Sequence, residues 1–123
     1  MQYVHARICS IFKKLVEKKP GFRLPPWERA PLDLLREDEE LSLVMLLSDF
    51  PYAVGCSAEA LEPHQICNYL EELAAAFHQC YTLHTVISED SDLTAARLAL
   101  IEGVRIIVRS GLGLLGVSAP EQM

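Results

Sequence analysis

The clearest periodic pattern along the chain lies between Glu62 and Tyr81. Pro63 suits the first turn of a helix, where its missing N–H group costs no hydrogen bond. Apolar side chains then recur at steps of three and four residues, at Ile66, Tyr69, Leu70, Leu73, Ala74, Phe77 and Tyr81. Polar side chains occupy most of the remaining positions. The pattern predicts a central helix with one side packed in a core and the other in water.

A first helix is predicted over residues 3–19. At 100° per residue its apolar side chains share one side, at Val4, Ile8, Phe12, Leu15 and Val16. His5 lies near the edge of this side, so we expect a histidine at the core margin and not a catalytic base. The segment 19–31 holds four prolines and predicts a connecting loop, which Phe22 and Trp27 pin to the body.

The region after this loop is predicted to be a helix in two pieces. Acidic residues at 37–40 suit the positive end of a helix, where we expect a solvated first turn. The run at 41–50 has large apolar side chains on more than one face, which is typical of a helix buried on most sides. Pro51 bends or breaks the pattern, and residues 52–61 resume it.

The last helix is predicted over residues 93–110. Asp92 or Thr94 is a candidate N-cap, and Gly111 is the expected end. No segment of convincing length alternates between polar and apolar residues as a strand does. The sequence therefore predicts an all-α fold, a helical bundle of about four to five helices that forms a single domain over residues 1–123.

Length and composition agree with one soluble domain. A chain of 123 residues is long enough to bury a core of its own. Charged residues interrupt every apolar run before about 18 residues, the length that a membrane helix needs. The opening segment lacks the order of a secretory signal. We therefore expect a monomer in the cytoplasm with no membrane partner.

Cysteine spacing and short motifs offer little evidence for catalysis or metal binding. The four cysteines show no CxxC spacing, so we expect buried free thiols and no metal site. Cys80 lies between His78 and His84, but nothing points to an oxyanion site beside it. The GLGLLG segment at 111–116 matches GxGxxG in letters, yet a helix precedes it and too little chain follows for a dinucleotide fold. No catalytic residue is predicted.

The charge of the chain is unevenly distributed. The net charge is −6, but residues 1–29 carry +5 and the remainder −11. Within the first helix, one arc of roughly 60° holds Tyr3, Arg7, Lys14 and Lys18. From the residues alone this basic aromatic stripe has two interpretations: it makes the helix soluble, or it attracts a polyanion.

Several segments together resemble the anticodon-binding domain of arginyl-tRNA synthetases. These are QYVHARICSIF at 2–12, FP at 50–51, the helix EPHQICNYLEELAAAFHQCY at 62–81, ARLAL at 96–100 and the ending GLGLLGVSAPEQM at 111–123. The family is named after an Asp-Ala-Leu-Arg motif, which appears loosely as Thr94 to Arg97. The likeness covers nearly the whole chain. By this resemblance the chain is similar to the carboxyl-terminal domain of such an enzyme, separated from the catalytic domain that lies upstream in the family.

This resemblance implies a helical bundle that binds the anticodon stem and loop of arginine tRNA. ATP and arginine would bind the upstream catalytic domain, so the domain alone needs no cofactor and catalyses nothing. By position, Tyr3, Tyr81 and Met123 match residues near the anticodon bases. The stripe agrees with this at Tyr3, since unstacked bases can stack on an aromatic ring. Arg7, Lys14 and Lys18 would then meet phosphates.

Other interpretations stay open. The acidic remainder of the chain would suit a structural or protein-interaction module that does not bind tRNA. The related domain of another synthetase, such as the cysteine enzyme or the β chain of the glycine enzyme, is a further alternative. Arg97 could form an ion pair with Asp92 or Glu102 or could contact RNA. The tRNA hypothesis requires an exposed Tyr3 on the same side of the molecule as Tyr81 and Met123.

Overall fold

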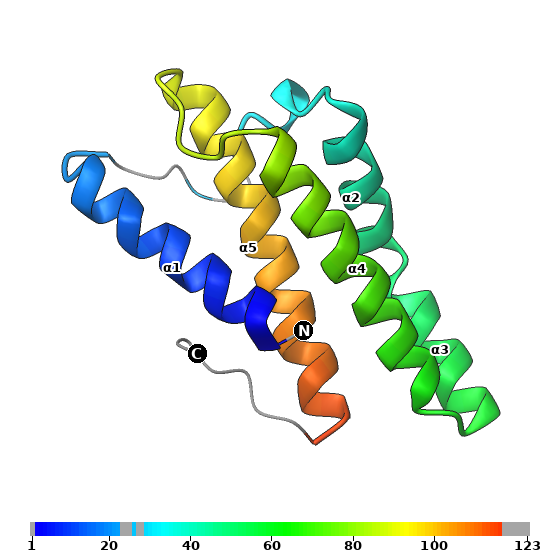
Figure 1. The fold of residues 1–123 in the computed structure, drawn as a ribbon. Coiled ribbons are helices and arrows are strands. Elements are labelled where there is room, and N and C mark those ends of the chain that lie inside the picture. The colour runs from blue at the N-terminus through cyan, green and yellow to red at the C-terminus, as the bar shows by residue number, and fades with distance from the viewer. Residues whose placement is uncertain (1, 23–25, 27–28, 117–123) are drawn as a thin grey trace.

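The computed structural model describes residues 2–22, 26 and 29–116, and within them the chain is all-α, as predicted. The elements bounded within the described residues follow one another as α1 (Gln2–Lys18), the short 3-10 helix η2 (Leu32–Leu34), α2 (Asp38–Ser48), α3 (Phe50–Ala60), α4 (His64–Leu83) and α5 (Ser91–Leu114). In Figure 1, α1 crosses over α5, and α4 lies beside α5. α2 and α3 pack on the far side of α4.

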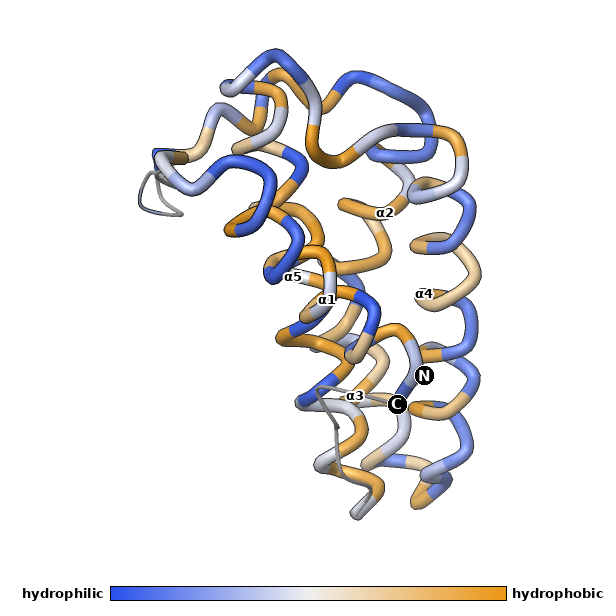
Figure 2. Tube along the Cα trace, turned by 60° about the vertical axis from the view of Figure 1, so that its left-hand side comes forward, coloured by the Kyte–Doolittle hydropathy of each residue, from blue (hydrophilic) through white to orange (hydrophobic). Residues whose placement is uncertain are grey.

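The core lies where α4 and α5 meet the other helices. The predicted stripe of α4 faces it, with Ile66, Tyr69, Leu70, Leu73 and Phe77 buried and Ala74 and Tyr81 half-buried. The buried apolar residues of α5 include Ala96, Leu98, Leu100, Ile101, Val104, Val108 and Leu112. In Figure 2, hydrophobic and hydrophilic positions alternate within the turns of each helix. The central helix is confirmed, although Pro63 is its N-cap and it continues to Leu83.

α1 packs on α5 through four buried apolar side chains, Val4, Ile8, Ile11 and Leu15. These lie within about 60° of one another on the helix, whereas Val16 is 100° further round from Leu15. The expectation that Val16 shares the packed side is therefore wrong, and 67% of its surface is exposed. His5 is buried, with Nδ1 3.9 Å from Cys9 Sγ. Phe22 packs against the core, and Trp27 lies outside the described residues.

α2 is less covered than its apolar composition predicts. Leu43 is buried, but Leu41, Val44 and Met45 are 46%, 38% and 70% exposed. The prediction of a helix buried on most sides is wrong because α2 packs against α4 and α5 on one side and nothing in the described residues covers the other. Tyr69 of α4 anchors it by donating its phenol to the Leu46 carbonyl, and burial raises the pKa of Tyr69 to about 12.

The first turn of α2 also differs from the prediction. Glu37 and Glu40 form a capping box, in which each side chain bonds the backbone of the other. Glu40 is only 1% exposed and forms an ion pair with Arg97, so it is not part of a solvated turn. The predicted break in the helix is confirmed, since α2 and α3 meet at Asp49 with a bend of 42°.

None of the helices in the described ranges is by itself both long enough and apolar enough to cross a membrane. Within these ranges, α2 and α3 reach that length and apolar character only when they are taken together. A bend of 42° separates them, and the comparison considers length and composition alone.

Both predicted ends of α5 are wrong by a few residues. The N-cap is Asp90, whose carboxylate accepts hydrogen bonds from the backbone N–H groups of Asp92 at 3.0 Å and Leu93 at 3.3 Å. Thr94 is fully buried, and its Oγ1 accepts a hydrogen bond from the backbone of Ser88. At the other end, α5 continues past Gly111 to Leu114.

Gly111 serves packing instead of helix termination. A Cβ atom at this position would lie 2.8 Å from Cδ2 of Leu70, which is itself fully buried in α4. The missing side chain therefore allows α4 and α5 to approach each other closely.

We expect Gly111→Ala to lower the free energy of unfolding by about 1–2 kcal/mol, because crowding Leu70 outweighs the better helix propensity of alanine. Gly113→Ala is the matched control, since no atom from another part of the described structure lies within 4 Å of its added methyl group. That change should be neutral or should stabilise the helix by up to about 1 kcal/mol. Urea unfolding followed by circular dichroism measures both. Equal effects of the two substitutions would contradict the packing role of Gly111.

Candidate nucleic-acid interface

Two tyrosines and an arginine from α1 and α4 form the centre of the candidate site. Tyr3 and Arg7 are one helical turn apart on α1, which places them on one face. Tyr81 comes from the last turn of α4. The Arg7 guanidinium carbon lies 5.3 Å from the centre of the Tyr3 ring and 5.1 Å from that of Tyr81. These are cation–π distances, so the arginine is held between the two rings.

His78 completes this group. Its ring stacks on that of Tyr3, with centres 5.8 Å apart and planes inclined by 28°. Below the surface, the buried Phe77 stacks on Tyr81 at 5.9 Å and fixes the position of that ring. We call Tyr3, Arg7, His78 and Tyr81 the tyrosine–arginine cluster. Tyr3 is the most exposed member of the cluster, and 46% of its surface is accessible to a ligand.

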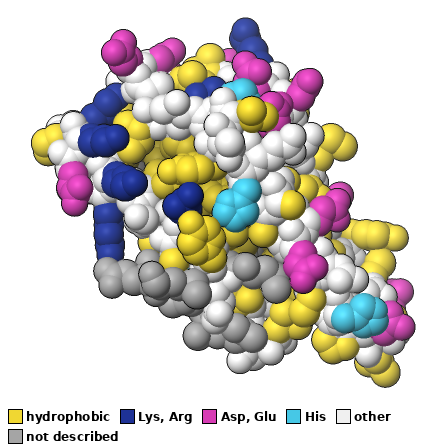
Figure 3. All heavy atoms as spheres, viewed as in Figure 1, with side chains coloured by type: hydrophobic (Ala, Val, Ile, Leu, Met, Phe, Trp, Pro, Cys, Tyr) yellow, Lys and Arg dark blue, Asp and Glu magenta, His cyan; other side chains and the backbone are white. Residues whose placement is uncertain are grey.

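The cluster carries positive charge. Among the described residues Arg7 has no carboxylate partner, and its Nε atom is buried without a hydrogen-bond acceptor. Figure 3 shows Lys and Arg side chains gathered over α1, with hydrophobic side chains next to them, whereas most Asp and Glu side chains in that view lie over the other elements. The uneven charge of the sequence thus becomes a basic face on α1.

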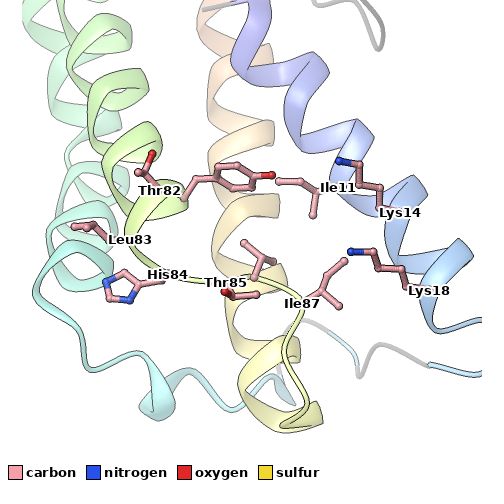
Figure 4. A pocket seen from close by; sticks show the side chains of 10 residues that line it. Ile11, Lys14, Lys18, Thr82, Leu83, His84, Thr85 and Ile87 are labelled. Atoms are coloured by element: carbon pink, nitrogen blue, oxygen red, sulfur yellow. The ribbon is translucent and has the colours of Figure 1, made fainter.

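A pocket of about 280 Å³ adjoins the cluster. Ile11, Lys14 and Lys18 of α1 form one wall, and Tyr81 with the segment Thr82–Ile87 forms the other. In Figure 4, Lys14 and Lys18 extend from α1 toward this segment, which carries Thr85 and Ile87. Within the described ranges neither lysine has an ion-pair or hydrogen-bond partner. Two uncompensated ammonium groups therefore border the pocket.

The pocket wall opposite the lysines, the segment Thr82–Ile87, is fixed by contacts with residues outside the segment. Arg97 donates Nη1–H to the Thr85 carbonyl at 2.6 Å and Nε–H to the Glu40 carboxylate at 3.1 Å. His84 lies 3.3 Å from Glu39, again joining the segment to α2. At the far end, Lys19 donates its ammonium to the Ser88 carbonyl. These contacts connect the segment between α4 and α5 to α5, to α2 and to the residue that follows α1.

The structure thus brings together five of the six residues predicted from the sequence. Arg7 contacts both Tyr3 and Tyr81, and Lys14 and Lys18 border the adjoining pocket. The sixth, Met123, lies outside the described residues.

Two contacts of the site were missed or misassigned. His78 is not among the residues predicted for this site, although its spacing of three residues from Tyr81 places both on one helix face. Arg97 does form an ion pair, but with Glu40 and not with Asp92 or Glu102. Glu40 is 57 positions away, so helix periodicity could not reveal it.

The alternative sites considered from the sequence gain no support. Burial raises the pKa of the Cys80 thiol to about 11, with the nearby Glu40 carboxylate as a second cause, so little thiolate is present at neutral pH. In the part of the chain that the structure describes, no three His, Cys, Asp or Glu side chains gather as metal ligands would. Gly111 and Gly113 lie inside α5 and not in a phosphate-binding turn.

Comparisons with known proteins agree with this architecture. The family described as DALR anticodon binding domain matches residues 1–123. An arginine–tRNA ligase of Geotalea daltonii is 51% identical over 123 residues, all of this chain and 22% of that protein. The ligase of Desulfosudis oleivorans is 50% identical over the same shares. The chain therefore spans about a fifth of the length of these relatives.

A solved structure gives the same result for the fold. The arginyl-tRNA synthetase of Thermus thermophilus superposes with a TM-score of 0.78 and 31% identity, over 99% of this chain and 20% of that one. The family match extends over every residue, and the helices that carry the tyrosine–arginine cluster lie within it. This chain belongs to the DALR anticodon-binding domain family.

Proposed function

We propose that this chain is the tRNA-recognition module of an arginine–tRNA ligase and that it binds the anticodon stem and loop of arginine tRNA. The observation that carries the proposal is the tyrosine–arginine cluster. An exposed ring lies beside a guanidinium that has no carboxylate partner in the described residues, and unstacked loop bases are bound by such groups. Lys14 and Lys18 extend the positive charge along α1, where phosphates would follow.

In this proposal the chain performs recognition and the chemistry happens elsewhere. The arginine, the ATP and the acceptor end of the tRNA would meet in a catalytic domain upstream of the residues described. The module works as a monomer in the cytoplasm and needs no cofactor. Its family membership and the names of its relatives support this division.

A second candidate function is a protein-interaction module. Its specific support is the exposed apolar side of α2, where Leu41, Val44 and Met45 face outward. This surface lies on a different helix from the cluster, so the two functions do not exclude each other. The acidic charge outside α1 is compatible with either.

Titration of fluorescently labelled arginine tRNA at about 50 and 200 mM salt tests the proposed function. We expect binding that weakens as salt rises, because each phosphate contact made by Arg7, Lys14 or Lys18 releases a counterion. Removal of one of these charges should reduce the slope of log K against log salt by roughly 1. Unlabelled non-cognate tRNAs should compete poorly. Absence of binding even at the lower salt would refute the proposal and favour the interaction module.

A further inference from the structure

We infer that an apolar groove between η2, α2 and α5 binds an amphipathic helix of a partner protein, in which basic residues flank the apolar stripe. The described residues that line this surface, the α2 groove, include Leu32, Leu35, Leu41, Val44 and Ala99. The inference rests on the second candidate function and names the chemistry of its partner. It does not depend on tRNA binding, because the α2 groove shares no described residue with the tyrosine–arginine cluster or its pocket.

Three elements build the α2 groove. Leu32 and Leu35 come from η2 and the residue after it, and Leu41 and Val44 come from α2. α5 contributes Ala99, whose methyl group fills little space. The volume of about 500 Å³ is within the range of ligand pockets, so large apolar side chains of a partner can enter it.

The shape of the α2 groove suits a helical ligand. Leu41, Val44 and Ser48 follow one another at steps of three and four residues, so they share one side of α2 over about two turns, or roughly 10 Å. Leu32 on the opposite wall is 51% exposed. A helix covers such a surface with apolar side chains at positions i, i+3, i+4 and i+7. An added strand would need a sheet edge, and the described chain has no strand.

The charges beside the α2 groove favour a basic partner. Asp33 lies within η2, Glu37 and Asp38 begin α2, and Asp49 follows its last residue. All four side chains are exposed, and within the described ranges none of them forms an ion pair. Against them stands Arg36, so these neighbours of the groove carry a net charge of −3. Basic residues of a partner would meet these carboxylates, whereas RNA or an anionic membrane surface would be repelled.

The α2 groove is accessible while the basic face of α1 is occupied. In Figure 1, α1 lies on one side of α4 and α5, and α2 lies on the other. A partner in the groove and RNA on α1 therefore do not compete for the same surface.

The first test is fluorescence anisotropy of the whole chain with a labelled designed peptide. The peptide forms about four helical turns, with leucines at i, i+3, i+4 and i+7 and lysines at both ends. Its twin has glutamates in place of the lysines and the same leucines. We expect saturable one-to-one binding of the basic peptide, about tenfold or more tighter than binding of the acidic twin. Equal affinities, or no saturable binding of either peptide, would overturn the inference.

The second test locates the peptide. Leu41→Ser with Val44→Ser should weaken its binding about tenfold or more. Val16→Ser changes an exposed apolar residue of α1 and should leave binding unchanged. Amide NMR of the wild type needs no substitution and so covers a failure of the double variant to fold. The peptide should shift the signals of residues 41–48 and 99–103 and not those of residues 3–7. Shifts confined to α1 would contradict the inference.

The third test separates the groove from the overall negative charge. Asp33→Asn with Asp38→Asn should weaken binding of the basic peptide by about 2- to 30-fold. Glu59→Gln with Glu71→Gln changes the net charge of the chain equally at two exposed positions of α3 and α4, and it should have little effect. Equal losses in the two double variants would show attraction to net charge alone and would refute a specific site.

The remaining measurements distinguish other occupants and the two functions. Leu41→Ser with Val44→Ser should leave the affinity for the arginine anticodon stem-loop unchanged, so loss of the groove and loss of tRNA recognition are read separately. Sedimentation of the wild type should show one species at all concentrations. A dimer that this double substitution disrupts would assign the groove to a second copy of the chain. Binding to phosphatidylcholine vesicles that the same substitution abolishes would assign it to lipid, and either result would overturn the inference.

Discussion

Arg97→Met is expected to lower the free energy of unfolding by about 3–5 kcal/mol, a large part of the stability of a domain of this size. The cause is the Glu40 carboxylate, which is 1% exposed and would lose the guanidinium that compensates its charge. The Thr85 carbonyl would lose its 2.6 Å hydrogen bond at the same time. Urea unfolding followed by far-ultraviolet circular dichroism measures the loss.

A compensating change separates this ion pair from simple packing. Adding Glu40→Gln to Arg97→Met removes the buried charge but retains an amide that can complete the capping box at Glu37. We expect the double variant to recover more than half of the lost stability. Arg109→Met, an exposed position on the same helix, should change stability by less than about 0.5 kcal/mol. A loss below about 1 kcal/mol for Arg97→Met would show that the pair contributes little.

Tyr3→Ala is expected to weaken binding of the arginine anticodon stem-loop by about 5- to 150-fold, since stacking of one base is worth about 1–3 kcal/mol. The ring is 46% exposed, so its removal should leave the fold nearly as stable as before. Fluorescence anisotropy with labelled stem-loop measures the affinity, and circular dichroism verifies the fold.

Two further variants serve as controls for Tyr3→Ala. Tyr3→Phe keeps the ring over Arg7 and should retain most of the affinity. Tyr52→Ala removes a tyrosine that is 76% exposed on α3, away from the cluster, and should have no effect. If Tyr52→Ala weakens binding as much as Tyr3→Ala does, or if Tyr3→Ala has no effect, the cluster does not hold a base.

The helices themselves were largely predictable because each has a strong local pattern. The α4 stripe, the basic side of α1 and the helix break just before Pro51 depend on spacing and on residue chemistry, both of which the sequence contains. The burial of α2 was not predictable in this way. A helix with apolar side chains on two faces is equally compatible with full burial and with an exposed face, and the choice depends on how many neighbours the fold supplies.

In the candidate site, too, local patterns predicted some features, whereas others depend on contacts between distant residues. Periodicity placed Tyr3, Arg7, Lys14 and Lys18 on one side of a helix, but only the resemblance to a family connected that side with Tyr81. The contact between them arises because α1 and α4 both pack against α5. The Glu40–Arg97 pair and the wall of the pocket depend on residues far apart in the chain, so no local pattern could predict them.

Chemical probing of arginine tRNA with and without the protein tests the central claim most directly. We predict that bases of the anticodon loop become protected from modification in the complex. Protection should weaken in Tyr3→Ala and persist in Tyr52→Ala. Protection confined to the acceptor end, or unchanged loop reactivity at protein concentrations that saturate binding, would contradict recognition of loop bases by the tyrosine–arginine cluster.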